Sequence, residues 1–173
     1  MELTVVERII IANQLRILEK LYPGDYKERL TFIERGYTYN YRELSSGLNS
    51  ETPLDVCNEV IDILDMYRSI TISYKNLPET DISPNDILFS GFDMTSEEYH
   101  YGYATFYLNE LGRYEELLQG NPRRDLNSHG PTLRRYRRML EWWKPFLEEE
   151  QLESINYTLN EEQIKELLSL WKA

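Results

Sequence analysis

Signals that start and stop α-helices recur along the whole chain. Several threonine and glutamate pairs, such as Thr4 with Glu7, have the spacing of a capping box, which satisfies free backbone N–H groups in the first helical turn. Glycine or proline stands at most of the expected helix ends. The chain is therefore predicted to be mainly α. We predict helices over residues 5–22, 26–35, 53–69, 96–111, 131–147 and 159–172.

Two short segments interrupt the helical pattern. Residues 37–41 and 70–74 alternate with period two and are rich in aromatic and β-branched side chains, which is typical of strands. We expect them to pair into a short two-stranded β ribbon. No internal repeat and no long linker divides the sequence, and a chain of 173 residues with 41% hydrophobic content can bury a core. The expected architecture is one multihelical domain over residues 1–173.

The composition bounds the setting of the protein. The formal net charge is -11, which repels polyanions at long range. Cys57 is the sole cysteine, so no internal disulfide can form and a reducing cytoplasm is the expected location. No apolar run approaches the ~20 residues needed to cross a bilayer, so no membrane association is expected.

The first predicted helix is apolar on nearly every side. Such helices are usually buried, and a helix at the start of a small domain has few neighbours to cover it. We expect a second subunit to cover part of helix 5–22 in a homo-oligomer; burial inside its own monomer is the alternative. One side carries Val6, Ile10, Ile17 and Leu21, and the other carries Ile11, Leu15, Leu18 and Tyr22.

Two further helices differ in character. Helix 53–69 is amphipathic, and its predicted water-facing side is acidic. Helix 96–111 is apolar over most of its circumference and is the expected central helix, with Gly102 allowing a close helix crossing. The acidic residues of helix 53–69 are Asp55, Glu59, Asp62 and Asp65.

Helix 131–147 carries four arginines opposite its apolar side. Three interpretations stay open: a solvated face, pairing with an acidic surface of this chain or a partner, and an anion or nucleic-acid site. A winged-helix mode of DNA binding would place the acidic helix 53–69 in the major groove, which argues against nucleic acid as a partner. The arginines are Arg134, Arg135, Arg137 and Arg138.

Tyrosines concentrate on helix 96–111. Aromatic rings with polar tips line ligand pockets and interfaces, although core packing is the simpler explanation. The two histidines lack metal-spaced partners, and no nucleotide-binding or hydrolase motif occurs, so no metal, cofactor or catalytic residue is predicted. The candidate ligand-binding residues are Tyr99, His100, Tyr103, Tyr107, Asn109 and Glu110.

Several stretches in order cover nearly the whole chain and resemble the YfbU family of bacterial proteins. They are "ERIIIANQLRILEKLYP", "IERGY", "VIDILDMYRSI", "FSGFD" with "YGYATFYLNELGRY", and "PTLRRYRRMLEWW". The resemblance implies a multihelical bacterial domain that self-associates. It transfers no catalytic residue. The association of such domains with helix-turn-helix segments in some proteins hints at ligand sensing.

The leading functional hypothesis is a non-enzymatic module that binds a protein or a small ligand and self-associates. An enzyme of unknown class that uses the Tyr/His/Glu-lined helix 96–111 is the second hypothesis. An anion or nucleic-acid binder that uses the arginine face of helix 131–147 is the third.

Overall fold

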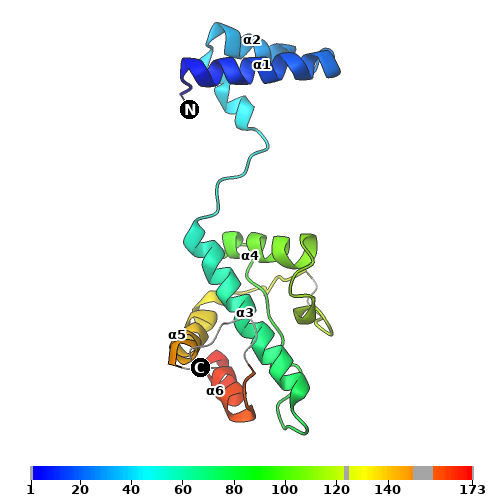
Figure 1. Cartoon of the computed structure of the whole chain (residues 1–173), viewed down its shortest axis with the longest axis vertical. Helices are drawn as coiled ribbons and strands as arrows, with labels where there is room; N and C mark the ends of the chain where they lie inside the picture. The colour runs from blue at the N-terminus through cyan, green and yellow to red at the C-terminus, as the bar shows by residue number, and fades with distance from the viewer. Residues whose placement is uncertain (1, 123–124, 150–157, 173) are drawn as a thin grey trace. The chain divides into compact units, whose positions relative to one another are not determined.

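The computed structural model describes residues 2–122, 125–149 and 158–172. It is mainly helical, as predicted (Figure 1). The chain forms two compact units, Met1–Glu51 and Thr52–Ala173, each with its own hydrophobic core. A single domain over residues 1–173 stays a prediction.

The first unit contains helices α1 (Val5–Leu21) and α2 (Lys27–Arg35), followed by the 3₁₀ helix η1 (Thr38–Ser45). The capping box at the start of α1 is confirmed: the Thr4 side chain accepts from the Glu7 N–H, and the Glu7 carboxylate accepts from the Thr4 N–H. α2 packs against both α1 and η1. The core of this unit is small and consists of Ala12, Leu15, Ile33 and Tyr41 with a few half-buried neighbours.

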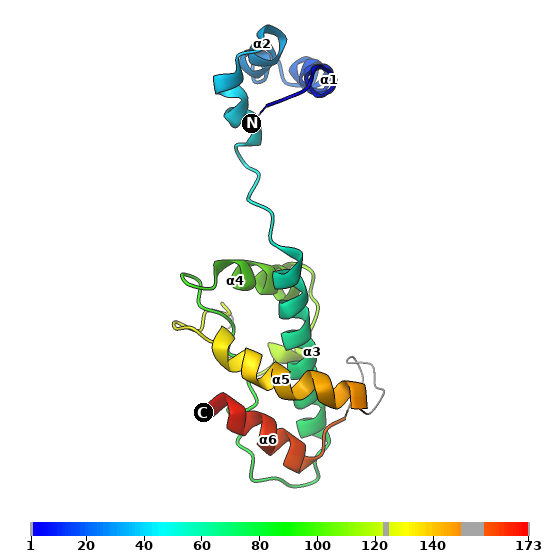
Figure 2. The ribbon, with the colours of Figure 1, turned by 90° about the vertical axis from the view of Figure 1, so that its left-hand side faces the viewer.

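The second unit is built around α3 (Leu54–Asn76), which is contacted by α4 (Glu98–Thr105), α5 (Leu133–Glu149) and α6 (Glu161–Lys172) (Figure 2). A π-helical turn, η2 (Phe106–Glu110), continues α4, and a 3₁₀ turn, η3 (Glu115–Leu117), also packs on α3. The expectation that helix 96–111 is central is wrong. Of α4, only His100 and Ala104 are buried, whereas ten residues of α3 are.

Aromatic rings fill the centre of the second unit. The rings of Tyr67, Phe89, Phe92 and Tyr136 lie with centroids 5.3–5.7 Å apart, mostly edge to face. Such pairs contribute about 0.5–1.5 kcal/mol each beyond the area that they bury. Tyr67 comes from α3, Tyr136 comes from α5, and Phe89 and Phe92 come from the loop between α3 and α4, so this cluster joins these three segments.

The predicted β ribbon is wrong. Residues 38–41 belong to η1, and residues 70–74 belong to the last turns of α3. The period-two pattern of residues 70–74 coincides with a continuing helical pattern, because Tyr67, Ile70 and Thr71 follow the buried face of α3. Packing on that face outweighs the β propensity of the branched residues. In the described residues the only β-type pairing is an isolated bridge between Phe92 and Asn127.

The backbone requires glycine at position 91, whereas no packing contact requires it at position 102. Gly91 has φ +75°, and an added Cβ would lie 1.9 Å from the Leu126 carbonyl oxygen, so only glycine fits beside the Phe92–Asn127 bridge. The close helix crossing expected at Gly102 is wrong, since an added Cβ there would meet nothing within 4 Å.

Candidate functional site

The predicted ligand-binding residues do not converge on one cavity. Tyr99, Asn109 and Glu110 are exposed, and His100 is buried. The structure does bring Tyr103 and Tyr107 together, with ring centroids 4.9 Å apart. The side-chain hydrogen bond between them raises the pKa of Tyr103 above its ordinary value. Tyr103 of α4 and Tyr107 of η2 are both half-buried, so their hydroxyls are available as hydrogen-bonding groups near the surface.

His100 lies in a different cluster, which joins α3, α4 and α5. Its Nε2 is 2.9 Å from Oε2 of Glu59, and its ring packs 5.5 Å from Phe92. Arg137 binds the same carboxylate through two nitrogens, at 2.7 Å from Oε1 and 2.9 Å from Oε2. The hydrogen bond from Arg137 is the main cause that lowers the pKa of Glu59, with a smaller contribution from His100.

The four arginines of α5 have four different surroundings. Arg134 is exposed, and the Arg135 guanidinium lies 5.1 Å from the centroid of the Trp171 ring. Arg137 is paired with Glu59, one of the acidic residues singled out in the sequence. Arg138 is half-buried, and its buried Nε makes no hydrogen bond to the described residues. The four arginines, although close together in the sequence, therefore do not form one uniform cationic surface.

The acidic side of α3 is likewise divided. Lys144 of α5 pairs with Asp62, so α5 meets α3 through a second ion pair besides that of Arg137. Asp65 was expected on the water-facing side, and this expectation is wrong. Asp65 is only 6% exposed and accepts a hydrogen bond of 2.7 Å from the Tyr114 hydroxyl. Burial is the main cause that raises the pKa of Tyr114, and the bond to Asp65 adds to it.

Sequence reasoning missed the role of Glu97, which was not among the predicted site residues. Glu97 is only 7% exposed. Its carboxylate accepts from the backbone N–H groups of Thr132 and Leu133 at the start of α5. The sequence does contain one indication of this role. Thr132 is followed three positions later by Arg135 instead of an acidic residue, so the start of α5 cannot form its own capping box and needs an acceptor from elsewhere in the chain.

Among the described residues, no group of three His, Cys, Asp or Glu side chains is placed to hold a metal ion. Nor does that part of the chain contain a helix long and apolar enough to span a bilayer. Asn109 borders a shallow hollow with Glu115 and Gln119, and none of the predicted tyrosines lines it.

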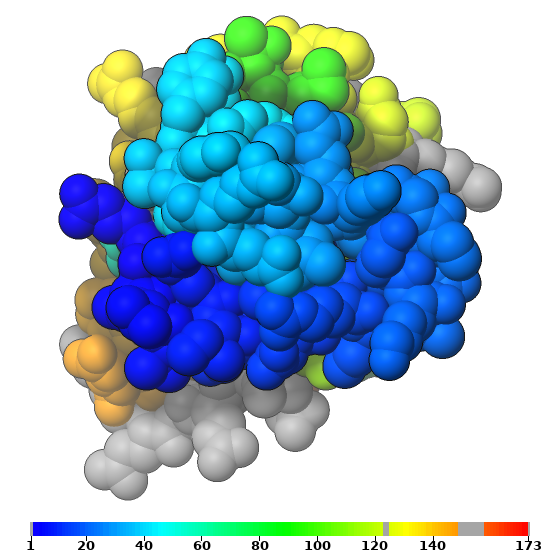
Figure 3. All heavy atoms as spheres, turned by 90° about the horizontal axis from the view of Figure 1, so that it is seen from above, coloured from blue at the N-terminus to red at the C-terminus, as the bar shows by residue number. Residues whose placement is uncertain are grey.

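Among the described residues, exposed large aliphatic side chains concentrate on α1. Figure 3 shows the first unit from above, with the dark blue side chains of α1 along one edge. Ala12 and Leu15 face the core of the unit, whereas the opposite side of the helix is open. We define the α1 outer face by Val6, Ile10, Asn13, Ile17 and Leu21. Its apolar members are 66%, 52%, 61% and 64% exposed, in that order.

A comparison with protein-family models identifies the same family that the sequence motifs resemble. The model described as the YfbU domain matches residues 1–169, which is nearly the full length of the 173-residue chain. The match spans both compact units, so it includes the α1 outer face as well as the cluster of Glu59, His100 and Arg137. The chain belongs to the YfbU family.

Proposed function

We propose that this protein is a cytoplasmic, non-enzymatic interaction module that self-associates through the α1 outer face. The observation that carries the proposal is the exposure of four large aliphatic side chains on one side of a single helix. Contiguous apolar patches of this kind mark interaction sites in water-soluble proteins. The proposed partner is a second copy of this chain.

The pattern of α1 is self-complementary about a two-fold axis. In an antiparallel pair centred between Asn13 and Gln14, Val6 lies opposite Leu21 of the second copy, and Ile10 lies opposite Ile17. Two-fold interfaces require this reciprocity, in which each residue meets the partner of its own partner. The spacing of the α1 outer face alternates between four and three residues up to Ile17, as in a coiled-coil seam.

Charge supports the same register. Glu7 and Lys20 are also equidistant from the centre, so Glu7 of each copy would lie level with Lys20 of the other along the helix axis. Both side chains are exposed. Asn13 would lie next to the axis, where its amide can hydrogen-bond to the same amide of the second copy. A single polar residue in an apolar seam fixes register at some cost in stability.

The exposed area predicts the effect of truncation. Full burial of an aliphatic side chain contributes about 1.5–3 kcal/mol, so burying the exposed half to two-thirds contributes about 1–2 kcal/mol. Ile10→Ala acts in both copies and should cost about 2–4 kcal/mol, which weakens dimerisation by about 30-fold to 1000-fold. Ile72→Ala is the matched control, because Ile72 is a partly exposed isoleucine of α3 in the other unit.

Analytical ultracentrifugation of the full chain over a wide concentration range tests the proposal. We expect a dimer for the unaltered chain and for Ile72→Ala, and a shift to monomer for Ile10→Ala. A monomer at all concentrations, even at about 0.1 mM, would assign the α1 outer face to another occupant and overturn the proposal.

Disulfide trapping tests the register in a Cys57→Ser background. Asn13→Cys should cross-link two copies, because position 13 lies beside the two-fold axis. Val6→Cys alone should not, since an antiparallel pair separates the two positions by about 22 Å along the helices at 1.5 Å per residue. Val6→Cys combined with Leu21→Cys should cross-link. Efficient cross-linking of Val6→Cys alone would indicate a parallel pair and refute the register.

A further inference from the structure

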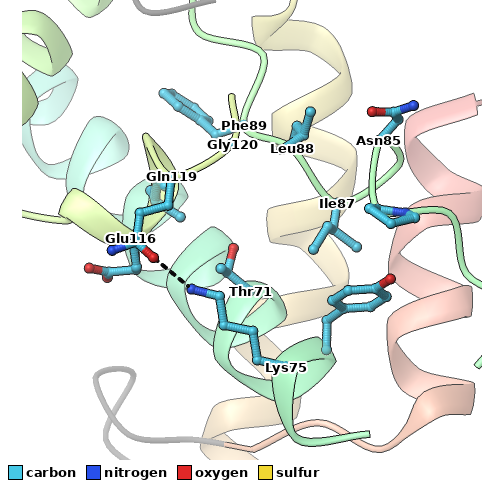
Figure 4. Close-up of a pocket in the computed structure, with 12 residues that line it drawn as sticks. Thr71, Lys75, Asn85, Ile87, Leu88, Phe89, Glu116, Gln119 and Gly120 are labelled. Carbon is cyan, nitrogen blue, oxygen red and sulfur yellow. Dashed lines mark hydrogen bonds between the residues drawn. The ribbon is translucent and has the colours of Figure 1, made fainter. Parts of the chain in front are cut away.

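The second unit contains a hollow that none of the predicted site residues lines. It has a volume of about 170 Å³ and lies between the last turns of α3, residues 84–89 and residues 116–120 (Figure 4). Its floor is apolar, because Ile87, Phe89 and Leu117 are 7%, 1% and 3% exposed. Thr71 and Lys75 of α3 supply a hydroxyl and an ammonium group to the wall and the rim.

The Thr71 hydroxyl lacks a protein partner. Thr71 is only 6% exposed and lines the hollow, and its hydroxyl makes no hydrogen bond to any described residue. The hydroxyl oxygen keeps some access to the hollow, since the fully buried side-chain atoms without a partner among the described residues belong to Thr105 and Arg138. Because Thr71 lines the hollow, an acceptor atom bound there can accept a hydrogen bond from this hydroxyl.

The rim carries the positive charge of Lys75. The Lys75 ammonium donates to the neutral amide oxygen of Gln119 at 3.1 Å and has no ion-pair partner within the described ranges. The Glu116 carboxylate also lines the hollow; against the opposing effect of burial, the hydrogen bond from Arg68 is the main cause that lowers its pKa, and the charge of Lys75 contributes. An ammonium group has three donors, so two remain for a ligand. Residues 71 and 75 are four apart and therefore share one face of α3.

We propose that this hollow binds a short-chain aliphatic carboxylate, a site and ligand class beyond the self-association argued above. The carboxylate would accept from Lys75 and from the Thr71 hydroxyl, and the aliphatic tail would lie against Ile87 and Phe89. An apolar cavity of about 150 Å³ accommodates a ligand with six carbon atoms. The volume therefore fits an acid of four to six carbons.

Butyrate is the probe, and butyramide is its uncharged counterpart of nearly the same shape. Both are titrated into the full, isotopically labelled chain at constant ionic strength, with backbone amide shifts measured by NMR. We expect saturable shifts at Leu117 and Gln119 with a dissociation constant for butyrate on the order of 1 mM, and binding of butyramide at least about tenfold weaker.

Variants separate a specific site from general charge effects. Lys75→Met should weaken butyrate binding by at least about tenfold, and Thr71→Val by about threefold to tenfold. Lys144→Met is the matched control, because Lys144 pairs with Asp62 and does not line the hollow. It removes the same charge and should leave binding unchanged.

Three results would overturn the assignment. One is the lack of shifts around the hollow at about 50 mM butyrate. Another is equal binding of butyramide, which would leave an apolar hollow without selectivity for a carboxylate. The third is an equal loss of binding in Lys75→Met and Lys144→Met. None of these results bears on dimerisation through the α1 outer face, which ultracentrifugation measures independently.

Discussion

The start of α5 depends on the Glu97 carboxylate, so Glu97→Gln is a demanding test of the second unit. Oε1 accepts from the N–H groups of Thr132 at 2.8 Å and Leu133 at 2.7 Å. Oε2 accepts from the Asp93 N–H at 2.9 Å and from the Thr132 hydroxyl at 3.0 Å. Glutamine has nearly the same shape but offers one acceptor oxygen in place of two and carries no charge.

The expected loss follows from the better orientation of the new amide. With its oxygen toward Thr132 and Leu133, two hydrogen bonds survive as neutral ones, and each loses about 1 kcal/mol relative to a bond with a carboxylate. The amide nitrogen then faces the Asp93 N–H, which loses its acceptor at a cost of about 1–3 kcal/mol. The Thr132 hydroxyl can donate to the Gly91 carbonyl instead. The free energy of unfolding should fall by about 3–5 kcal/mol.

Urea unfolding monitored by tryptophan fluorescence measures this loss selectively, because Trp142, Trp143 and Trp171 all lie in the second unit. For an m-value of about 2 kcal/mol/M, the midpoint should fall by about 2 M. Glu98→Gln is the matched control, since Glu98 is the exposed neighbour with the same charge. A Glu97→Gln midpoint that coincides with that of Glu98→Gln would refute the role given to Glu97.

Three further substitutions test other parts of the second unit by the same unfolding assay. Gly102→Ala should raise the free energy of unfolding by about 0.5–1 kcal/mol, since the added methyl group meets nothing and alanine favours the helix. A lower free energy of unfolding would contradict this and would indicate that another helix packs closely at Gly102. Gly91→Ala should lower the free energy of unfolding by about 3 kcal/mol or more, because φ is +75° and the added carbon collides with the Leu126 carbonyl oxygen. The third substitution is Glu59→Gln, tested by its pH dependence. Arg137 lowers the pKa of Glu59 below its usual 4.5, so the stabilisation is complete above about pH 4.5 and is lost as the pH falls through the folded-state pKa. Between about pH 5 and pH 3 the unaltered chain should therefore lose more stability than Glu59→Gln, and parallel curves would contradict this.

Local signals predicted the helices well where the interactions that define them are local. The capping box of α1 involves residues three positions apart, so both partners are visible in the sequence. The end of α3 was placed too early, because residues 70–74 satisfy a strand pattern and a helical pattern at once. The deciding information was the longer helical repeat through Val60, Ile63, Leu64 and Tyr67, which continues into Ile70.

The polar clusters could not be predicted in the same way. His100 was grouped with tyrosines of its own helix, but its partner Glu59 lies 41 positions away in the sequence. Arg137 lies 78 positions from the same carboxylate. Periodicity assigns each residue to a side of its own helix, and it contains no information on which sides meet. The hollow beside Thr71 was missed for the same reason, since its lining comes from segments that are separate in the sequence.

Helices α1 and α3 show how far an apolar pattern can be interpreted. Both carry aliphatic residues over much of their circumference, yet Val60, Ile63 and Leu64 of α3 are 0% exposed while Ile10 and Ile17 of α1 are more than half exposed. The difference lies in the neighbours: α4, α5 and α6 surround α3, whereas in its unit α1 packs against α2 and a small core. A unit of about 50 residues buries a smaller fraction of its surface than a larger one. The apolar pattern therefore indicates that the α1 outer face is buried against another molecule. The two-fold symmetry of the residues on this face is the reason to propose a second copy of the chain as that molecule.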